Sequence, residues 1–230
     1  ADVARRIAHE IKNPLTPIQL SAERLRRKYL PQIKDDPETF ARCTDTIIRQ
    51  VNDIGHMVSE FSSYARLPGS MKTVENAVDI CQDALVLQKE AHPDIVFGFI
   101  AESPAIQVSC DRAQLTQVIT NLLQNAIDSI YERQPQKSGD GRIKVVVSCP
   151  DSDHVSISVE DNGIGLPEKV RYQLLEPYVT TKRKGAGLGL AIVKKIMEDH
   201  AGSVLLEDAV YQDVKSGAKA VIVFPRGIFV

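Results

Sequence analysis

The chain has 230 residues, of which 43% are hydrophobic and 25% are charged, enough for one or two domains with apolar cores. Its 28 basic and 30 acidic residues give a net charge of −2, and this balance argues against a surface built to bind DNA or RNA. Four scattered cysteines indicate reduced thiols of a cytosolic protein and not a zinc site or disulfide framework, and no run of about 20 apolar residues offers a membrane span.

Residues 1 to about 66 are predicted to form two long helices, because apolar or small side chains recur every three or four residues and mark one seam on each helix. The seam positions are Ile7, Ile11, Leu15, Ile18, Ala22, Leu25 and Tyr29, then Phe40, Thr44, Ile47, Val51, Ile54, Val58, Phe61 and Ala65. Pro31 and Pro37 interrupt the pattern, so we expect an antiparallel hairpin. A lone hairpin buries only part of its seam, and pairing of two hairpins into a dimeric four-helix bundle would bury the rest. The helical pattern is already under way at Ala1, so we also expect the chain to be a fragment of a longer protein.

A turn-rich stretch at Pro68-Gly69-Ser70 ends the hairpin, and mixed periodicity follows. Helices are predicted near 76–91, 111–133 and 187–200, and strands at 95–101, 106–109, 142–149, 155–160, 203–207 and 218–224. The neighbouring strands 142–149 and 155–160 predict antiparallel pairing, with helices on one face of the sheet. The predicted fold class is therefore α+β, with a helical hairpin in residues 1–67, a linker in 68–73 and an α/β sandwich domain in 74–230.

The first predicted helix carries the sequence His9-Glu10-Ile11-Lys12-Asn13-Pro14. His9 is two residues from the seam positions on either side of it, so we expect its side chain to be exposed. An isolated exposed histidine is usually only a solvated surface residue. Here Glu10 could accept a proton from the ring and leave the opposite nitrogen free to attack phosphorus. Asn13, one turn further on, could orient a water or a phosphoryl oxygen.

Pro14 and Pro17 fall inside this predicted helix, where a proline removes a backbone donor and costs about 3 kcal/mol or more. The ring of Pro14 displaces the bond that the carbonyl of Glu10 would accept, so one expectation is a bend beside His9. The alternative is a helix that starts only after Pro14.

Three motifs in the second part together predict a site for a nucleotide and its metal: Asn121-Leu122-Leu123-Gln124-Asn125, Asp161-Asn162-Gly163-Ile164-Gly165 and Gly185-Ala186-Gly187-Leu188-Gly189-Leu190. Asn121 and Asn125 lie one turn apart on an apolar helix, and a carboxamide oxygen suits Mg²⁺. Asp161 follows a strand, where its carboxylate can accept a hydrogen bond from an adenine amino group while glycines let the backbone approach the base. The last motif precedes an apolar helix whose N-terminal amides suit phosphates. Taken singly, an asparagine pair on a helix is more typical of capping or core hydrogen bonds, and the D-x-G-x-G pattern is common in turns.

The segment from Glu176 to Gly185 has no clear periodicity, and its basic residues and glycine predict a mobile lid over a triphosphate. The chain lacks both the G-x-x-x-x-G-K-[ST] loop and the H-R-D motif, which excludes two well-known phosphoryl-transfer folds. The four motifs together predict ATP-dependent phosphorylation of the chain's own histidine.

In order and spacing, these motifs resemble the H, N, G1 and G2 boxes of bacterial sensor histidine kinases, and Glu176-Pro177-Tyr178 resembles their F box, with tyrosine in place of the usual phenylalanine. The segment from His9 to Arg24 is also similar to nitrogen-regulation sensors of the NtrY type. The resemblance covers nearly the whole chain. It implies a dimerisation and histidine-phosphotransfer hairpin followed by a Bergerat-type ATP-binding domain.

The resemblance also implies a role for each motif residue. His9 would be the phosphoacceptor, Glu10 the general base, and Asn13 the residue that positions water when the partner is dephosphorylated. Asn125 would bind Mg²⁺ and Asp161 would contact adenine. The remaining contacts to ATP would come from Asn121, Gly163, Gly165, Thr181, Lys182, Gly185, Gly187, Leu188 and Gly189.

The implied partners are a second copy of the chain, bound through the hairpin, and the receiver domain of a response regulator, whose aspartate takes the phosphoryl group. A phosphatase activity on that regulator stays open. No nucleic acid is implied, and no membrane contact by this fragment. The implied place is the cytoplasmic portion of an inner-membrane sensor in nitrogen-related two-component signalling.

Two other functions are weighed against this one. An ATPase of the gyrase, chaperone or mismatch-repair kind places a glutamate one turn before the metal-binding asparagine, and this chain has Asn121 there. Without that base, transfer to a tethered histidine fits better than hydrolysis by water. A non-catalytic dimeric ATP-binding scaffold is the second alternative, but such a protein is expected to lose His9, Asn125 or the glycines, and all are present.

Overall fold

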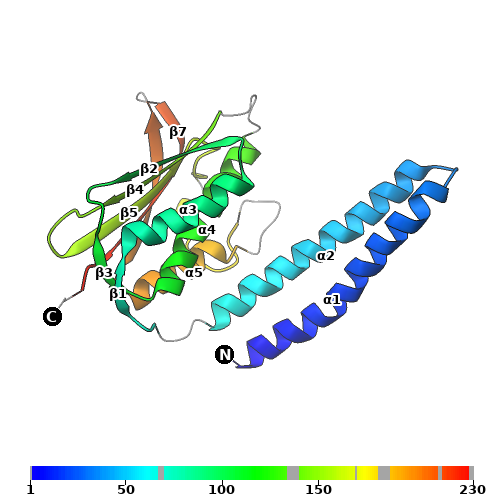
Figure 1. Ribbon diagram of the computed structural model, residues 1–230, viewed down its shortest axis with the longest axis horizontal. Coiled ribbons are helices and arrows are strands. Elements are labelled where there is room, and N and C mark those ends of the chain that lie inside the picture. Colours follow the sequence, from blue (N-terminus) through cyan, green and yellow to red (C-terminus); the bar gives the residue numbers. More distant parts are fainter. Residues whose placement is uncertain are drawn as a thin grey trace. The chain divides into compact units, whose positions relative to one another are not determined.

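The computed structural model describes residues 2–66, 70–133, 140–168, 170–180, 187–211 and 214–227, without the side chains of residues 2–7, 9, 56, 60, 63–66, 211 and 214–216. The chain divides into two compact units. The first comprises Ala1–Leu67 and Tyr178–Leu188, and the second comprises Pro68–Pro177 and Gly189–Val230. N-terminal helices followed by a mixed α/β domain confirm the predicted α+β class (Figure 1).

Two long helices form the hairpin of the first unit: α1 (Asp2–Tyr29) and α2 (Pro37–Arg66), joined by the 3₁₀ turn η1 (Leu30–Gln32) (Figure 1). Helix α1 continues through Pro14 and Pro17, so the alternative of a helix that starts after Pro14 is wrong. Helix α2 begins with Pro37, whose missing N–H is not needed in a first turn. The side chain of Asp36 accepts a hydrogen bond from the amide of Thr39 at 3.1 Å.

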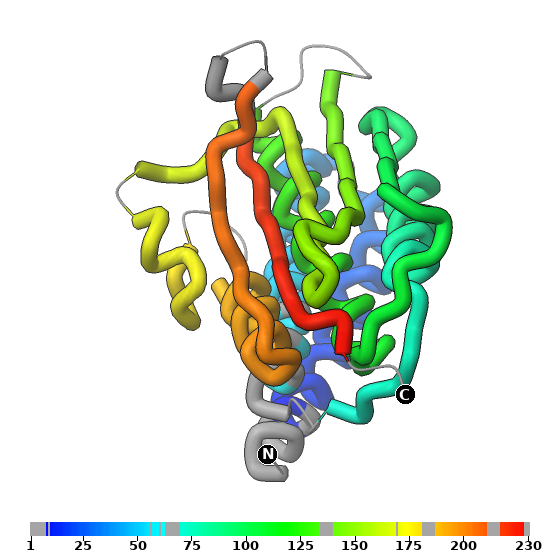
Figure 2. The backbone as a smooth tube through the Cα atoms, turned by 90° about the vertical axis from the view of Figure 1, so that its left-hand side faces the viewer, coloured from blue at the N-terminus to red at the C-terminus, as the bar shows by residue number. Residues whose placement is uncertain are grey.

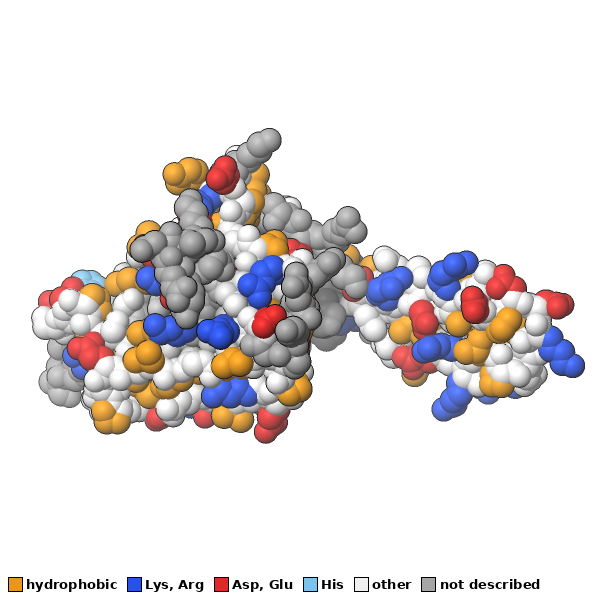
Figure 3. Space-filling view, turned by 90° about the horizontal axis from the view of Figure 1, so that it is seen from above, with side chains coloured by type: hydrophobic (Ala, Val, Ile, Leu, Met, Phe, Trp, Pro, Cys, Tyr) orange, Lys and Arg blue, Asp and Glu red, His pale blue; other side chains and the backbone are white. Residues whose placement is uncertain are grey.

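The apolar positions of the hairpin form two layers, as expected of a seam that a lone hairpin buries only in part. One layer is buried, with side chains 3–9% exposed, and comprises Ala8, Ala22, Thr44, Val51 and Val58. The other lies three residues further along each helix, is 37–47% exposed, and comprises Ile11, Ile18, Leu25, Ile47 and Ile54. Figure 3 shows hydrophobic side chains lying among charged ones on the surface of this unit. Ile7 and Ala65, also in the predicted seam, lie outside the described side chains.

A five-stranded sheet is the centre of the second unit, in the order β2-β4-β5-β7-β6. Its strands are β2 (Ile95–Ala101), β4 (Gly141–Ser148), β5 (His154–Asp161), β6 (Ser203–Tyr211) and β7 (Val214–Pro225). β2 and β4 are parallel, and the other neighbours are antiparallel. The predicted pairing of the two central strands is confirmed, with Val145 opposite Val159. A separate antiparallel pair joins β1 (Thr73–Asn76) to β3 (Gln107–Cys110).

Three helices cover one face of this sheet: α3 (Ala77–Ala91), α4 (Arg112–Glu132) and α5 (Gly189–Asp199) (Figure 1). Figure 2 views the sheet from the face that the helices leave open. The alternation along β4 fits this arrangement, because Val145 and Val147 are fully buried while Arg142 and Lys144 are exposed. A short 3₁₀ turn, η2 (Arg171–Gln173), precedes α5 in the chain.

Asp111 fixes the N-terminus of α4. Its Oδ1 accepts a hydrogen bond from the amide of Gln114 at 3.1 Å, and its Oδ2 accepts one from the amide of Met71 at 3.0 Å. Its own amide donates to Nε2 of the buried His200 at 3.1 Å, and Nδ1 of that ring lies 2.8 Å from the carbonyl of Ile196 on α5. The ring therefore accepts at Nε2 and donates at Nδ1, and it holds the start of α4 against the end of α5.

Within the described ranges, no helix combines the length and the apolar character that crossing a membrane would require.

Candidate functional site

One face of α4 carries three polar side chains at intervals of four residues: Asn121, Asn125 and Ser129. The opposite side of the helix is apolar and buried, with Leu123 and Ile127 fully covered. Asn121 donates from Nδ2 to the carbonyl of Gly189 at 3.3 Å, which joins α4 to the first residue of α5. Asn125 is half-buried on the same face.

Asp161 is the last residue of β5 and is only 7% exposed. Its Oδ1 accepts two hydrogen bonds, one from the amide of Gly163 at 2.8 Å and one from the hydroxyl of Ser129 at 3.2 Å. The sequence placed this carboxylate at the end of a strand, and the structure agrees. A buried carboxylate that is oriented by these hydrogen bonds can serve as a fixed acceptor for a ligand amino group.

The loop after Asp161 packs closely against α4 at Ser129. The amide of Ile164 donates both to the carbonyl of Ser129 at 3.2 Å and to its Oγ at 3.1 Å. A Cβ on Gly163 would lie 2.1 Å from that Oγ, so only glycine fits there. Asn162 ties the loop to the start of β4, since its Oδ1 accepts from the amide of Arg142 at 2.8 Å.

Sequence reasoning missed Ser129. The signal that could have found it is the spacing, because Ser129 continues the four-residue interval of Asn121 and Asn125 along one helix face.

Two further glycines shape the backbone around Asp161. Gly165 adopts a φ of +79°, in the left-handed region that glycine favours. A Cβ on Gly217, in β7, would lie 1.9 Å from the carbonyl oxygen of Asp161. Gly217 was not among the predicted site residues, and its role depends on the pairing of distant strands.

The loop that follows Asp161, residues 162–165, is called the aspartate loop. Two ion pairs attach the segment between this loop and Pro177 to the rest of the second unit. Glu176, the first residue of the expected lid, accepts from Nζ of Lys194 on α5 at 2.8 Å. Arg171 in η2 pairs with Asp208 on β6. The chain that leads to the expected lid is therefore attached at two points of the second unit.

A hydrogen bond joins the backbone on either side of residues 181–186: Tyr178 lies in the expected lid, and Gly187 lies two residues beyond its last residue, Gly185. The amide of Tyr178 donates to the carbonyl of Gly187 at 3.0 Å, and both residues have positive φ, +65° and +67°. A Cβ on Gly187 would lie 2.9 Å from the carbonyl carbon of Tyr178. Leu188 is buried at 1% exposure. Thr181, Lys182 and Gly185 lie outside the described residues, so their expected phosphate contacts stay predictions.

The histidine motif lies on α1. Glu10 and Asn13 are exposed on that helix, while the side chain of His9 lies outside the description and its exposure stays a prediction. A groove of about 300 Å³ runs between α1 and α2 beside the motif; its lining includes Lys12, Thr16, Asn52, Gly55 and Ser59.

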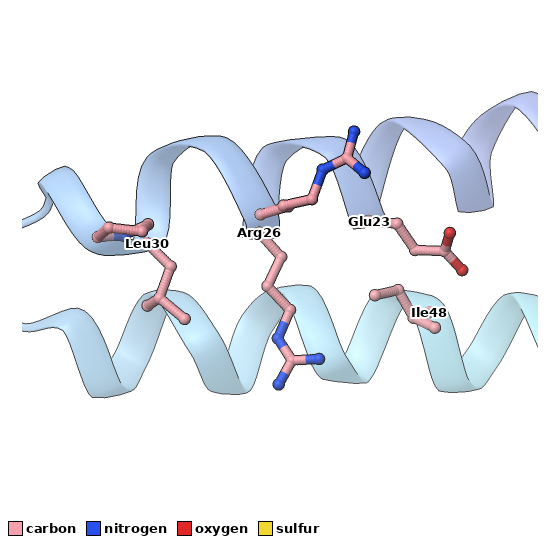
Figure 4. Close-up of a pocket in the computed structure, with 6 residues that line it drawn as sticks. Glu23, Arg26, Leu30 and Ile48 are labelled. Carbon is pink, nitrogen blue, oxygen red and sulfur yellow. The ribbon is translucent and has the colours of Figure 1, made fainter.

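A second hollow, of about 370 Å³, lies at the closed end of the hairpin (Figure 4). Its lining comes from both helices and the turn between them, and includes Glu23, Arg26, Leu30 and Ile48. Arg26 also pairs with Asp45 at 3.1 Å.

The second unit thus brings together five of the predicted nucleotide residues, from α4, the aspartate loop and the start of α5. These are Asn121, Asp161, Gly163, Gly165 and Gly189, with Asn125 on the same face of α4 as Asn121.

Comparison with known families agrees with both parts. Residues 110–228 match the model of the histidine kinase-, DNA gyrase B- and HSP90-like ATPases, and residues 1–69 match the His kinase A (phospho-acceptor) domain. The chain belongs to the sensor histidine kinase family. Membership implies that the second unit is an ATP-binding domain.

Individual relatives support the same family. The nitrogen regulation protein NtrY of Azorhizobium caulinodans is 53% identical over 209 residues, which is 91% of this chain and 27% of that protein. The chain therefore spans about a quarter of the length of this relative. The histidine kinase ThkA, solved in complex with the response regulator protein TrrA, is 27% identical with a TM-score of 0.68, covering 99% of this chain and 62% of that one. Full-length ShkA, with a TM-score of 0.73 over 97% of this chain and 45% of that one, is 21% identical and shares the fold.

Proposed function

We propose that this chain transfers the γ-phosphoryl group of ATP to His9 and then passes it to an aspartate in the receiver domain of a response regulator. The observation that carries the proposal is the pairing of two sites in one chain. A buried, oriented carboxylate faces the N-box helix in the second unit, and the phosphoacceptor motif lies on α1 of the first.

The nucleotide roles follow from the chemistry of each group. Asp161 accepts from the adenine amino group, next to the close backbone of Gly163 and Gly165. Asn121 lies beside the start of α5 at Gly189. The phosphates bind to backbone amides of the last motif, at Gly185, Gly187 and Leu188, and to Thr181 and Lys182.

The donor set around Asn125 fits Mg²⁺. Its carboxamide is a neutral oxygen ligand on the face of α4 that also carries Asn121 and Ser129. A single protein ligand suits an ion that keeps its waters and bridges substrate phosphates. The metal would neutralise charge on the triphosphate, and Asn125 would hold it in place.

On the hairpin, the chain's own groups supply the acceptor. Glu10 takes the proton from the ring of His9, which leaves the opposite nitrogen as nucleophile. Asn13 lies one turn from His9 and positions water when the phospho-partner is hydrolysed, which gives the protein a phosphatase activity as well. Asn121 replaces the glutamate that gyrase-like ATPases use to activate water, and this favours transfer to histidine over hydrolysis.

The exposed apolar layer supports a homodimer. Ile18, Leu25 and Ile47 are each 44–47% exposed on one hairpin, and pairing with a second hairpin would bury them in a four-helix bundle. In this arrangement residues 1–67 form the dimerisation and phosphotransfer domain, 68–73 the linker, and 74–230 the catalytic domain.

The groove between α1 and α2 supports a docking place for the response regulator. It begins at Lys12, within the histidine motif, and is lined by small and polar side chains such as Gly55 and Ser59. ThkA, which covers the same fold, was solved with a response regulator. The identity to NtrY supports nitrogen-related signalling, in the cytoplasmic portion of an inner-membrane sensor.

Incubation with Mg-ATP tests the proposal, because phosphohistidine is labile in acid and stable in base. The chain should acquire such label, and His9→Gln should abolish it while calorimetry still detects ATP binding. His154→Gln, which changes an exposed histidine of the second unit, is the control and should label normally. Label that persists in His9→Gln would refute the acceptor assignment.

A further inference from the structure

We propose that Ser129 is a positioning residue for nucleotide recognition, because its hydroxyl fixes the orientation of the Asp161 carboxylate that reads the adenine amino group. The inference rests on the proposed role of Asp161 and adds a residue from a different element. Ser129 comes from α4, whereas Asp161 ends β5, so the hydroxyl joins the helix of the N box to the aspartate motif.

Two donors converge on one oxygen of the carboxylate. Oδ1 of Asp161 accepts from Gly163 N at 2.8 Å and from Ser129 Oγ at 3.2 Å. A carboxyl group is planar, so holding Oδ1 from two directions also sets the direction of Oδ2. At 7% exposure, water has little access to replace a lost donor. Without the Ser129 hydroxyl, Oδ1 would lose one of these two donors and with it this link to α4.

The hydroxyl of Ser129 also accepts from the amide of Ile164 at 3.1 Å while it donates to Asp161. A hydroxyl has both a donor and an acceptor in one small group, and this pair of bonds uses both. The space admits little more, because even a Cβ on Gly163 would come within 2.1 Å of the same oxygen. Alanine would lose both bonds and leave the helix intact, since its helix propensity exceeds that of serine.

Orientation of the carboxylate matters for one feature of the ligand. The adenine amino group is a donor and needs an acceptor in a fixed direction. Purine riboside triphosphate carries hydrogen in place of that amino group. It therefore cannot donate a hydrogen bond to the carboxylate of Asp161. A group that acts through Asp161 must therefore affect ATP and not this analogue.

Calorimetric titration of the whole chain with Mg²⁺ and each nucleotide tests the inference. Ser129→Ala should bind ATP about tenfold more weakly, the size of effect expected for one hydrogen bond to a charged group, and should bind purine riboside triphosphate as the unaltered chain does. Thr116→Ala is the matched control. It removes a hydroxyl from the same helix, where Thr116 donates to the carbonyl of Arg112, and should change neither affinity.

Asp161→Asn, alone and combined with Ser129→Ala, separates the possible failures. If Ser129 acts through Asp161, the double variant should bind ATP no more weakly than Asp161→Asn alone. Equal weakening of both nucleotides by Ser129→Ala, or additive losses in the double variant, would overturn the positioning role. Unchanged ATP affinity in Asp161→Asn would instead refute the adenine contact itself, and the inference would fall with it.

Discussion

Gly163 shows how little room the aspartate loop leaves for a side chain. A methyl group there would meet the hydroxyl of Ser129 at 2.1 Å and its carbonyl carbon at 2.5 Å. Gly163→Ala should therefore push the loop away from α4 and weaken ATP binding by about tenfold or more, since such overpacking typically costs 1–3 kcal/mol. Titration calorimetry measures the loss directly.

Gly98 provides the control for that substitution. It lies on β2 of the same unit, and a Cβ there would meet its nearest neighbour, the carbonyl oxygen of Ile143, at 3.9 Å, an ordinary contact. Gly98→Ala should leave ATP affinity unchanged. If Gly163→Ala and Gly98→Ala bound ATP equally well, the loop would have to accommodate a methyl group without weakening nucleotide binding, and the prediction would be wrong.

The position of a single site residue could be predicted where its immediate sequence neighbours determine that position. Asp161 follows a strand and precedes two glycines, so its position at a strand end could be read directly from the sequence. Ser129 and Gly217 could not be found this way. Their roles depend on which surface of α4 meets the loop and on β7 lying beside β5, and those contacts join residues 32 or more positions apart in the chain.

At the scale of elements, caps explain why some boundaries were predicted closely. Helix α3 begins after Asn76 and α4 after Asp111, and both side chains accept a hydrogen bond from the amide of a residue in the first turn. Strand β1 was not predicted. Its four residues, Thr73–Asn76, show no alternation, and only pairing with β3 defines them as a strand.

The hairpin shows where periodicity is insufficient. A spacing of three and four residues marks an apolar stripe, but it does not reveal that Ala22 lies inside the hairpin and Leu25 outside it. Both positions belong to the same repeat. Which positions are buried depends on which side of each helix packs against the other. That choice is made by the two helices together and cannot be read from the spacing along one of them.

Asp111 should make the stability of the second unit depend on pH. Partial burial raises the pKa of its carboxyl, but hydrogen bonds from the amides of Gln114, Met71 and Ala113 outweigh burial and hold the pKa below its ordinary value of 3.8. The charged cap therefore stabilises the fold above that pH, and its contribution disappears as the pH falls through the lowered pKa. Asp111→Ala should cost about 1 kcal/mol at pH 7 and much less at about pH 2. Urea unfolding at the two pH values measures both.

Asp199→Ala, which removes an exposed carboxylate at the end of α5, is the control for this effect and should change stability little at either pH. A cost for Asp111→Ala that is the same in acid and at neutral pH would show that the charge of the cap contributes nothing.

At the scale of the whole molecule, the exposed apolar layer predicts the state of association. Ile18 is 47% exposed, so Ile18→Asp should leave each hairpin folded but place two buried charges in the dimer. The dimerisation constant should fall on the order of a hundredfold or more, because an unpaired buried charge costs several kcal/mol. Sedimentation velocity at several concentrations measures the shift from dimer to monomer.

Leu87 on α3 offers a matched control, since it is 68% exposed on a helix of the other unit. Leu87→Asp should leave the association unchanged. An Ile18→Asp chain that still sediments as a dimer would place the interface elsewhere on the molecule.

The order of the sheet was beyond prediction from this one sequence. Antiparallel pairing of β4 with β5 follows from their closeness in the chain, but the insertion of β7 between β5 and β6 does not. Strand periodicity is the same for any partner, and the choice is made by the side chains that the finished sheet buries against its helices.

The parallel alignment of β2 and β4 has a consequence for how the protein matures. Two parallel neighbours cannot be joined by a tight turn, so the polypeptide must travel back along the sheet between them, and α4 lies on that return path. The N-box asparagines thus gain their final place only once strands separated by some 40 residues have met, a slow kind of encounter for a folding chain. Competence to hold a nucleotide should accordingly emerge late during refolding, well after the local hairpin of α1 and α2 has formed.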